Sequence, residues 1–199
     1  ACLVGSEMCI RDRITGAHAG IIQPRVAKSH EHKGARTKEM AEVFTPSWIC
    51  NAQNNLVDQA WFERDVVFNR ELDHGWETIT DKITFPEGTP KKTWQAYVDE
   101  RRLEITCGEA PYLVSRYDTV TGETIKLQDR IGLLDRKLRI VGENTDTEAD
   151  WLKWAERAVQ ATYGFEFQGD SLLLARENIL FTYSCLLYTS PSPRDRQKS

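Results

Sequence analysis

Two acidic side chains and one glycine stand at the ends of two predicted strands. Glu104 belongs to the apolar strand predicted for residues 103–106, Gly108 lies in the tight turn CGEAP that follows, and Glu166 lies near the end of YGFEF, which contains the short predicted strand FEF. In open α/β sheets, ligands bind beyond the carboxyl ends of the strands. A glycine there lets the backbone approach a ligand closely, and a carboxylate there can accept hydrogen bonds from both hydroxyls of a ribose. The sequence therefore predicts a nucleoside-containing cofactor.

The turn after the first of these strands favours a cofactor that carries no phosphates. Gly108 stands alone, so the G-x-G-x-x-G pattern of dinucleotide-binding proteins is absent. A pyrophosphate would need more open backbone at the start of a helix.

A helix is predicted upstream of these strands, in the segment TPSWICNAQNNLVDQAWF. Thr45 followed by Pro46 is typical of a helix start, with a hydroxyl cap and then a proline in the first turn. Apolar residues recur at helical spacing, so one face is expected to be buried. That face comprises Trp48, Ile49, Ala52, Leu56, Ala60 and Trp61. Residues 65–93 are expected to be rich in loops, because glycine and proline interrupt them.

The rest of the chain is expected to alternate between helices and strands. Short helices are predicted for 93–102 and 130–141, a hairpin turn for TVTGET, and a longer helix for 146–164, which Gly164 ends. The buried stripe of this longer helix is Trp151, Trp154, Ala155, Ala158, Val159 and Thr162. A last helix follows, with Asp170 as its cap. Strand, helix and strand in this order predict right-handed βαβ units and a mostly parallel sheet.

Three segments resemble motifs of the S-adenosylmethionine-dependent DNA adenine-N6 methyltransferases. LEITCGEAPYL resembles L-D-P-A-C-G-S-G-x-F-L, YGFEFQGDSLLLAREN resembles G-I-E-I-D-P-x-A-x-x-L-A-R-x-N, and EVFTP is similar to the upstream T-P motif. Their order along the chain is the order of that family. The whole stretch of residues 16–184 resembles the modification (M) subunits of bacterial restriction–modification systems. The resemblance implies an α/β fold: part of a Rossmann-like class I methyltransferase domain, with a mostly parallel sheet flanked by helices.

The resemblance also implies how S-adenosylmethionine is held. Thr45, followed by Pro46, would bind the methionine carboxylate, and Glu104 would order the loop and approach the methionine ammonium. Cofactor contacts from below are expected at Cys107, Gly108 and Ala110, which would form the floor of the site. Glu166 would hold the ribose hydroxyls, and Phe167 would contact the adenine ring. Two positions of the first loop depart from the family pattern. Glu104 replaces the usual aspartate, and Ala110 replaces a glycine, so the backbone angles there are expected to be ones that alanine tolerates.

The residues that would hold the target base are absent from the sequence. Amino-group methylation requires the adenine to leave the base stack and enter a pocket. In the family that this chain resembles, the motif Asn/Asp-Pro-Pro-Tyr/Phe forms that pocket, and no such tetrapeptide occurs here. We therefore expect catalytic residues only beyond Ser184, in an intact parent enzyme that methylates double-stranded DNA, with a possible restriction or specificity subunit as partner. We expect the fragment itself to be inactive and poorly soluble, because the sheet edges lack their neighbouring strands.

Other interpretations of the same residues remain open. Thr45 and Pro46 could serve only as a helix cap, Gly108 only as a turn, and Glu166 only as a solvated strand end. Cys107 is expected to pack in the core rather than act as a nucleophile, since no histidine is near it in sequence.

Three other functions are also open. A methyltransferase acting on RNA or protein would use the same two loops. A restriction endonuclease, alone or fused to the methylase, is the second; Asp135-Arg136-Lys137 offers half of a nuclease motif. A non-enzymatic binding module is the third.

The two ends of the chain are expected to be foreign to the protein. One codon choice for EMCIR reads, on the opposite DNA strand and in another frame, as LLYTS, so both ends resemble one translated sequencing-adapter element. Such segments are set aside before a fold is considered. The expected organisation is adapter-derived residues 1–13, a basic arm 14–41, the N-terminal part of a methyltransferase domain 42–184, and adapter-derived residues 185–199.

Composition narrows the class of protein further. The chain carries 30 acidic and 26 basic residues, so its overall charge does not indicate a nucleic-acid-binding protein. Cys50 and Cys107, the cysteines outside the adapter-like ends, are too few for a disulfide framework or a zinc site, and His30 and His32 lack partners for a metal. No stretch is apolar enough to span a membrane. A cytoplasmic location with no membrane partner and no metal is expected.

Overall fold

The computed structural model describes residues 26, 44–86, 88 and 91–189. The chain divides after Val43, and all the helices and strands named below belong to the unit that begins at Phe44. His30, His32 and the basic arm, apart from Val26, lie outside the described residues, as do residues 1–13.

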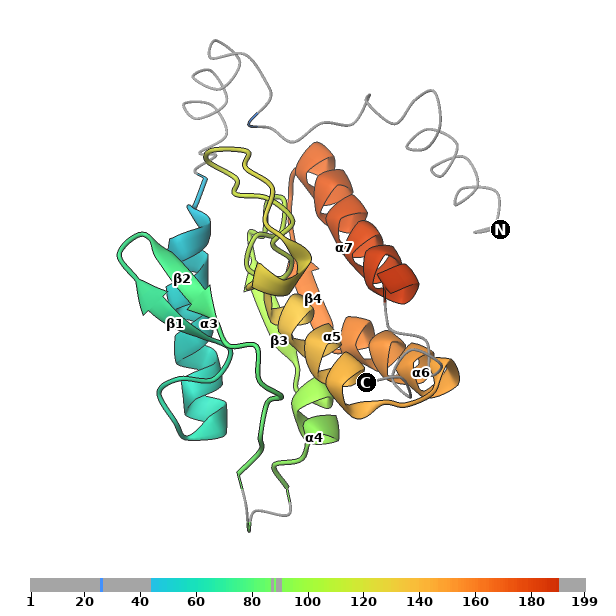
Figure 1. Cartoon of the computed structure of the whole chain (residues 1–199). Helices are drawn as coiled ribbons and strands as arrows, with labels where there is room; N and C mark the ends of the chain where they lie inside the picture. The colour runs from blue at the N-terminus through green and yellow to red at the C-terminus, as the bar shows by residue number, and fades with distance from the viewer. Residues whose placement is uncertain (1–25, 27–43, 87, 89–90, 190–199) are drawn as a thin grey trace, which may run out of the picture. The chain divides into compact units, whose positions relative to one another are not determined.

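A parallel pair of strands carries the two loops that the sequence singled out. β3 (Arg102–Ile105) pairs with β4 (Thr162–Phe165), and Glu104 lies opposite Gly164 in the register. The helices α5 (Leu133–Asn144) and α6 (Glu148–Gln160) lie between the two strands in sequence, and Figure 1 shows them beside the strands. The fold is mixed α/β, and the predicted parallel pairing is confirmed for these two strands. Each sheet in the described part has two strands.

One face of this parallel pair is apolar and exposed. Leu103 lies opposite Tyr163, and Ile105 lies opposite Phe165. All four side chains are exposed, and Ile105 reaches 70 %. Side chains alternate between the two faces of a strand, so these four share one face.

The segment expected to be rich in loops contains an antiparallel hairpin. β1 (Asn69–Leu72) pairs with β2 (Gly75–Thr78), a pairing that the sequence analysis did not predict. The strands are short and polar, and tertiary hydrogen bonds hold them. The indole of Trp76 donates to the backbone oxygen of Asp129, and the hydroxyl of Thr78 donates to Oδ1 of Asp129. Asp129 ends the 3₁₀ helix η3 (Leu127–Asp129).

Helix α3 (Ser47–Phe62) is where the sequence placed a helix, but the buried face is not the one expected. Leu56 is 64 % exposed and Trp48 is also exposed. The buried residues of α3 are Ser47, Cys50, Asn51, Asn54, Asn55, Asp58 and Phe62. The expectation of an apolar buried stripe was therefore wrong.

A buried arginine explains why α3 turns polar residues inward. Arg136 of α5 pairs with Asp58 at 2.6 Å, and both side chains are almost fully buried. The same guanidinium donates to the amide oxygens of Asn51 and Asn55. Tyr97 donates to the other oxygen of Asp58. Buried charges are tolerated when they are paired and hydrogen-bonded, and partners from distant segments supply those bonds here.

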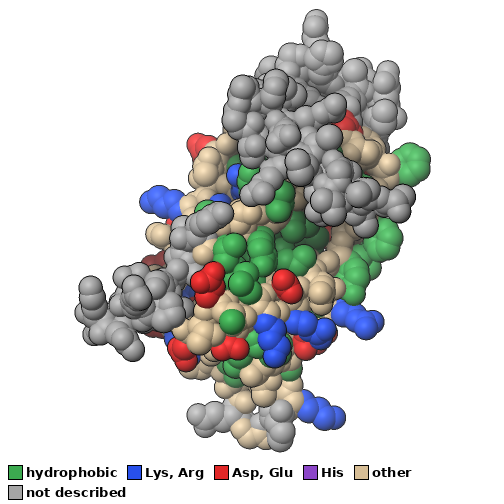
Figure 2. Space-filling view, turned by 90° about the vertical axis from the view of Figure 1, so that its right-hand side faces the viewer, with side chains coloured by type: hydrophobic (Ala, Val, Ile, Leu, Met, Phe, Trp, Pro, Cys, Tyr) green, Lys and Arg blue, Asp and Glu red, His purple; other side chains and the backbone are tan. Residues whose placement is uncertain are grey.

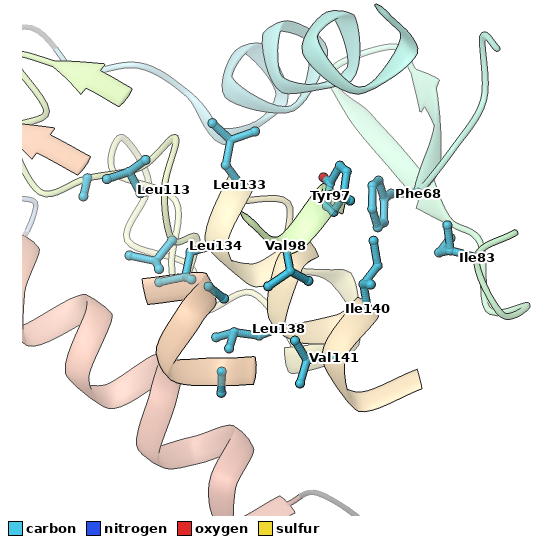
Figure 3. Packing of buried hydrophobic residues seen from close by; sticks show 14 of the residues in the cluster. Phe68, Ile83, Tyr97, Val98, Leu113, Leu133, Leu134, Leu138, Ile140 and Val141 are labelled. Carbon is cyan, nitrogen blue, oxygen red and sulfur yellow. The ribbon is translucent and has the colours of Figure 1, made fainter. Parts of the chain in front are cut away.

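The hydrophobic core lies between the hairpin, α4 (Trp94–Asp99), α5 and α6. Figure 3 shows Val98, Leu134, Leu138 and Val141 packed together. The predicted helices for 93–102 and 130–141 are confirmed with shifted ends. Thr93 caps α4 by accepting a bond from the N–H of Ala96.

The boundaries of the last elements differ from the predicted ones. Helix α6 ends at Gln160 rather than at Gly164, and Gly164 lies inside β4. A side chain at Gly164 would meet Sγ of Cys107 at 3.1 Å, so the glycine allows close strand packing. Asp170 lies within the first turn of α7 (Gly169–Thr189) rather than before it. The C-terminal residues set apart as adapter-derived do not begin at a helix end, because α7 runs past Ser184 to Thr189.

Hydrophobic side chains gather on the face where α6 and α7 lie (Figure 2). Leu173 and Leu180 of α7 are exposed, whereas Leu186 and Leu187 pack against the core. No helix in the described part of the chain is both long enough and apolar enough to cross a membrane.

Candidate functional site

The carboxyl ends of β3 and β4 meet, and this brings Gly108 to Glu166. The N–H of Cys107 donates to the backbone oxygen of Phe165 at 2.9 Å, which extends the parallel pairing by one bond. The N–H of Gly108 then donates to Oε2 of Glu166 at 2.7 Å. The N–H of Gln168 donates to Oε1 of the same carboxylate at 2.9 Å. Glu166 therefore holds both loops, and the interpretation of a merely solvated strand end is wrong.

The loop after β3 takes an unusual path. Thr106, Gly108 and Ala110 have φ angles of 54°, 55° and 63°, all in the left-handed region. This region is unfavourable for residues with a Cβ atom. Ala110 thus occupies a glycine-type conformation, and the expectation of backbone angles that alanine tolerates was wrong. An added side chain at Gly108 would meet no atom within 4 Å, so the space beside this loop is open.

Glu104 presents an unsatisfied carboxyl oxygen near this loop. Oε2 is buried and has no hydrogen-bond partner among the described residues. Burial raises the pKa of Glu104 to about 8; backbone N–H groups of Tyr112 and Leu113 oppose that rise, and the nearby charge of Glu166 adds to it. A carboxyl with a pKa raised by burial and a like charge is characteristic of ligand and catalytic sites. A bound ammonium group would satisfy the oxygen and favour its ionised form.

Thr45 lies before α3 but does not cap it. The cap position is Pro46, with no side-chain hydrogen bond, and the helix begins at Ser47. The interpretation of Thr45 as a helix cap is therefore wrong. Its side chain lies close enough to Tyr112, in the loop after β3, to lower the pKa of that tyrosine, which burial raises. The half-buried Thr45 thus belongs to the same neighbourhood as that loop.

The two cysteines of this neighbourhood are neutral thiols. Burial, with the Glu104 charge acting in the same direction, raises the pKa of Cys50 to about 12 and that of Cys107 to about 11. A thiolate is the reactive form of cysteine. Cys107 is almost fully buried beside Gly164, which agrees with the core-packing interpretation.

Phe167 points away from the packed core. Its side chain is 100 % exposed. It follows Glu166 directly, so an aromatic ring is available at the end of β4, and no contact of this ring with the loop after β3 is found in the described part of the structure.

Two residues not singled out from the sequence support the loops. Asn178 of α7 donates to the backbone oxygen of Glu109 and to the hydroxyl of Tyr117. Asp118 accepts from the N–H of Ser47 at 2.7 Å. Asn178 could have been noticed as the last residue of the second motif. Nothing local marks Asp118, since its partner is 71 residues away.

A separate cavity of about 350 Å³ lies between β2, η3 and α5. Thr78, Gln128, Arg130 and Arg139 are among its lining residues, and none of the eight cofactor-binding residues expected from the sequence lines it. Within residues 44–86, 88 and 91–189, no group of three or more histidine, cysteine, aspartate or glutamate side chains could hold a metal ion.

Comparison with known proteins gives no match. No protein-family model matches the chain, and neither a curated protein nor a solved structure does.

Proposed function

We propose that this chain is the S-adenosylmethionine-binding part of a site-specific DNA adenine-N6 methyltransferase of the modification-subunit type, with a Rossmann-like methyltransferase domain. The observation that carries the proposal is the meeting of Gly108 and Glu166 at the ends of two parallel strands. Ligands of open α/β sheets bind at this place. The motif resemblance of the same two loops supplies the cofactor's identity.

The residues present fit this cofactor. Oε2 of Glu104 is buried without a partner, which suits the methionine ammonium. Both oxygens of Glu166 accept one backbone N–H each. A carboxylate has about four acceptor sites, so capacity for the ribose hydroxyls remains. The open space beside Gly108 leaves room for the cofactor against the backbone.

Each residue then has one role. Thr45 would bind the methionine carboxylate, Gly108 and Ala110 would form the floor, and the exposed ring of Phe167 would contact adenine. When bound, S-adenosylmethionine supplies the methyl group. The base pocket, the double-stranded DNA contacts and any restriction or specificity subunit would belong to the intact parent, which we propose is the active enzyme.

The exposed face of the β3–β4 pair supports a larger sheet in the parent. This face is an apolar row of exposed side chains, formed by Leu103, Ile105, Tyr163 and Phe165. Parallel sheets are normally covered on both faces, because the helices that connect their strands pack against those faces. Further elements of the parent would bury this row.

Isothermal titration of the full chain with S-adenosylmethionine tests the cofactor assignment. Glu166→Gln should weaken binding by roughly 10- to 100-fold, since it removes a charged acceptor. Glu156→Gln is the matched control, because Glu156 is exposed on α6. A wild-type chain that shows neither heat nor thermal stabilisation with the cofactor would favour a non-enzymatic binding module.

Sequencing the source DNA across codon 184, without a transposon-based library, tests the parent enzyme. An open frame that continues into Asn/Asp-Pro-Pro-Tyr/Phe supports an adenine methyltransferase. A frame that encodes CLLYTSPSPRD and then stops contradicts both the adapter origin of residues 185–199 and the enzyme. A continuing frame without that tetrapeptide favours a methyltransferase acting on RNA or protein.

A further inference from the structure

Asp118 bridges a hairpin turn and the start of α3. Its Oδ2 accepts from the N–H of Ser47 at 2.7 Å, and its Oδ1 accepts from the N–H groups of Val120 and Thr121, both at 2.8 Å. The turn itself is closed by an antiparallel bridge between Tyr117 and Thr124. One carboxylate therefore orders the turn and ties it to the helix.

This bond supplies the cap that α3 lacks. The first N–H groups of a helix have no partner inside the helix, and α3 has no side-chain cap of its own. A negative charge at this end is also favoured by the helix dipole. Burial raises the pKa of Asp118, but the hydrogen bonds from Ser47 and from the turn outweigh burial and leave that pKa lowered. The carboxylate is thus held in its charged form.

A second bond from the next residue holds the other side of Pro46. The hydroxyl of Thr119 donates to the backbone oxygen of Thr45 at 2.8 Å, and Thr119 is buried. Two adjacent residues of the turn, Asp118 and Thr119, therefore hydrogen-bond to the backbone on both sides of Pro46. The side chain of Thr45 does not cap α3 and instead lies near Tyr112, in the loop after β3.

We propose that Asp118 is a positioning residue for the amino-acid end of the cofactor, because it caps α3 and thereby places Thr45 beside the loop after β3. The inference rests on the proposed function. The motif resemblance gives the 117–124 turn no role. Under this inference, the turn determines the affinity for the methionine part of the ligand. The adenosine part, held at Glu166, should not depend on it.

Two ligands that share the adenosine part, but differ in the amino-acid chain and in the charge on the sulfur atom, test this division. S-adenosylmethionine carries the methionine carboxylate and ammonium, whereas 5′-methylthioadenosine lacks both. In titrations of the full chain, Asp118→Asn should weaken S-adenosylmethionine binding about tenfold, as expected for loss of a helix cap. Binding of 5′-methylthioadenosine should change by less than about twofold. Asp73→Asn, in the exposed β1–β2 turn, is the matched control and should change neither affinity.

Equal weakening of both ligands, or no weakening of either, would overturn the positioning role while leaving the cofactor assignment intact. Wild-type chain that binds neither ligand would overturn the cofactor assignment and this inference with it. If Asp118→Asn loses its cooperative thermal transition, the titrations are repeated with Thr119→Val. This variant removes only the bond to the backbone oxygen of Thr45. That variant should again weaken S-adenosylmethionine selectively, and an unselective change would overturn the inference.

Discussion

The N–H of Gly108 donates to Oε2 of Glu166 at 2.7 Å, across 58 residues of sequence. The bond joins the loops at the ends of β3 and β4, and the opposite oxygen of the same carboxylate accepts from Gln168. The Glu166 side chain therefore connects the two loops, beside the backbone bond from Cys107 to Phe165.

Replacing this carboxylate should loosen the junction. Glu166→Gln turns one acceptor into an amide group that faces a backbone N–H, so the free energy of unfolding should fall by about 1–2 kcal/mol. Urea unfolding followed by circular dichroism measures this change, with Glu156→Gln as the exposed control. An unchanged midpoint would show that the Gly108 bond contributes nothing to stability.

Glu104 should lower the free energy of unfolding at high pH. Its pKa is raised to about 8 in the folded chain, above the ordinary value of 4.5. The folded state thus holds its proton more tightly than the unfolded state, and this contribution to stability is lost as the pH rises from 4.5 through 8. Glu104→Gln should therefore be more stable than the wild type at pH 8, and the advantage should disappear at pH 4.5.

The same variant should bind S-adenosylmethionine more weakly, because the amide cannot pair with the ammonium. In the wild type, ionisation of Glu104 on binding should release close to one proton at pH 7, about one pKa unit below its pKa. Titrations in buffers of different ionisation enthalpy count this proton. A release that persists in Glu104→Gln would assign the proton to another group.

Lys137 should make stability depend on pH in the opposite sense. It is fully buried, and its ammonium donates to the backbone oxygens of Glu100 and Ala161. Burial lowers the pKa of Lys137 from 10.5 to about 7, with the Arg102 charge acting in the same direction. The unfolded chain then binds the proton more tightly, so stability should rise between pH 7 and 10.5. Thermal unfolding at pH 7 and 9.5 measures the rise, and Lys137→Met should reduce it. An equal rise in the variant would rule out Lys137 as its source.

Losing one methyl group at Ala110 and gaining one at Gly132 should change the stability of the fold by very different amounts. Ala110→Gly relieves a left-handed backbone angle by roughly 1 kcal/mol and loses a buried methyl worth about the same. The net change should be near zero. Gly132→Ala places Cβ at 2.3 Å from the backbone oxygen of Leu113, so it should lose more than about 3 kcal/mol. Denaturant midpoints of both variants check the contrast, and a tolerated Gly132→Ala would contradict the packing of the 113–132 contact.

Local sequence was enough for the elements whose own residues specify them. The helices within 130–141 and 146–164, the strand near 103–106 and the TVTGET turn were predicted because helical spacing, capping residues and turn residues act over a few positions. The placement of Glu104, Gly108 and Glu166 at strand ends followed from the same patterns.

Only the tertiary structure decided which face of α3 is buried and what caps it. The asparagines of α3 face inward because Arg136 arrives from another helix to meet them, and Ser47 is capped by Asp118 from 71 residues away. The polar strands of the β1–β2 hairpin likewise depend on Asp129. A polar side chain can be buried only where a partner satisfies it, and distance along the chain does not reveal where that partner will lie.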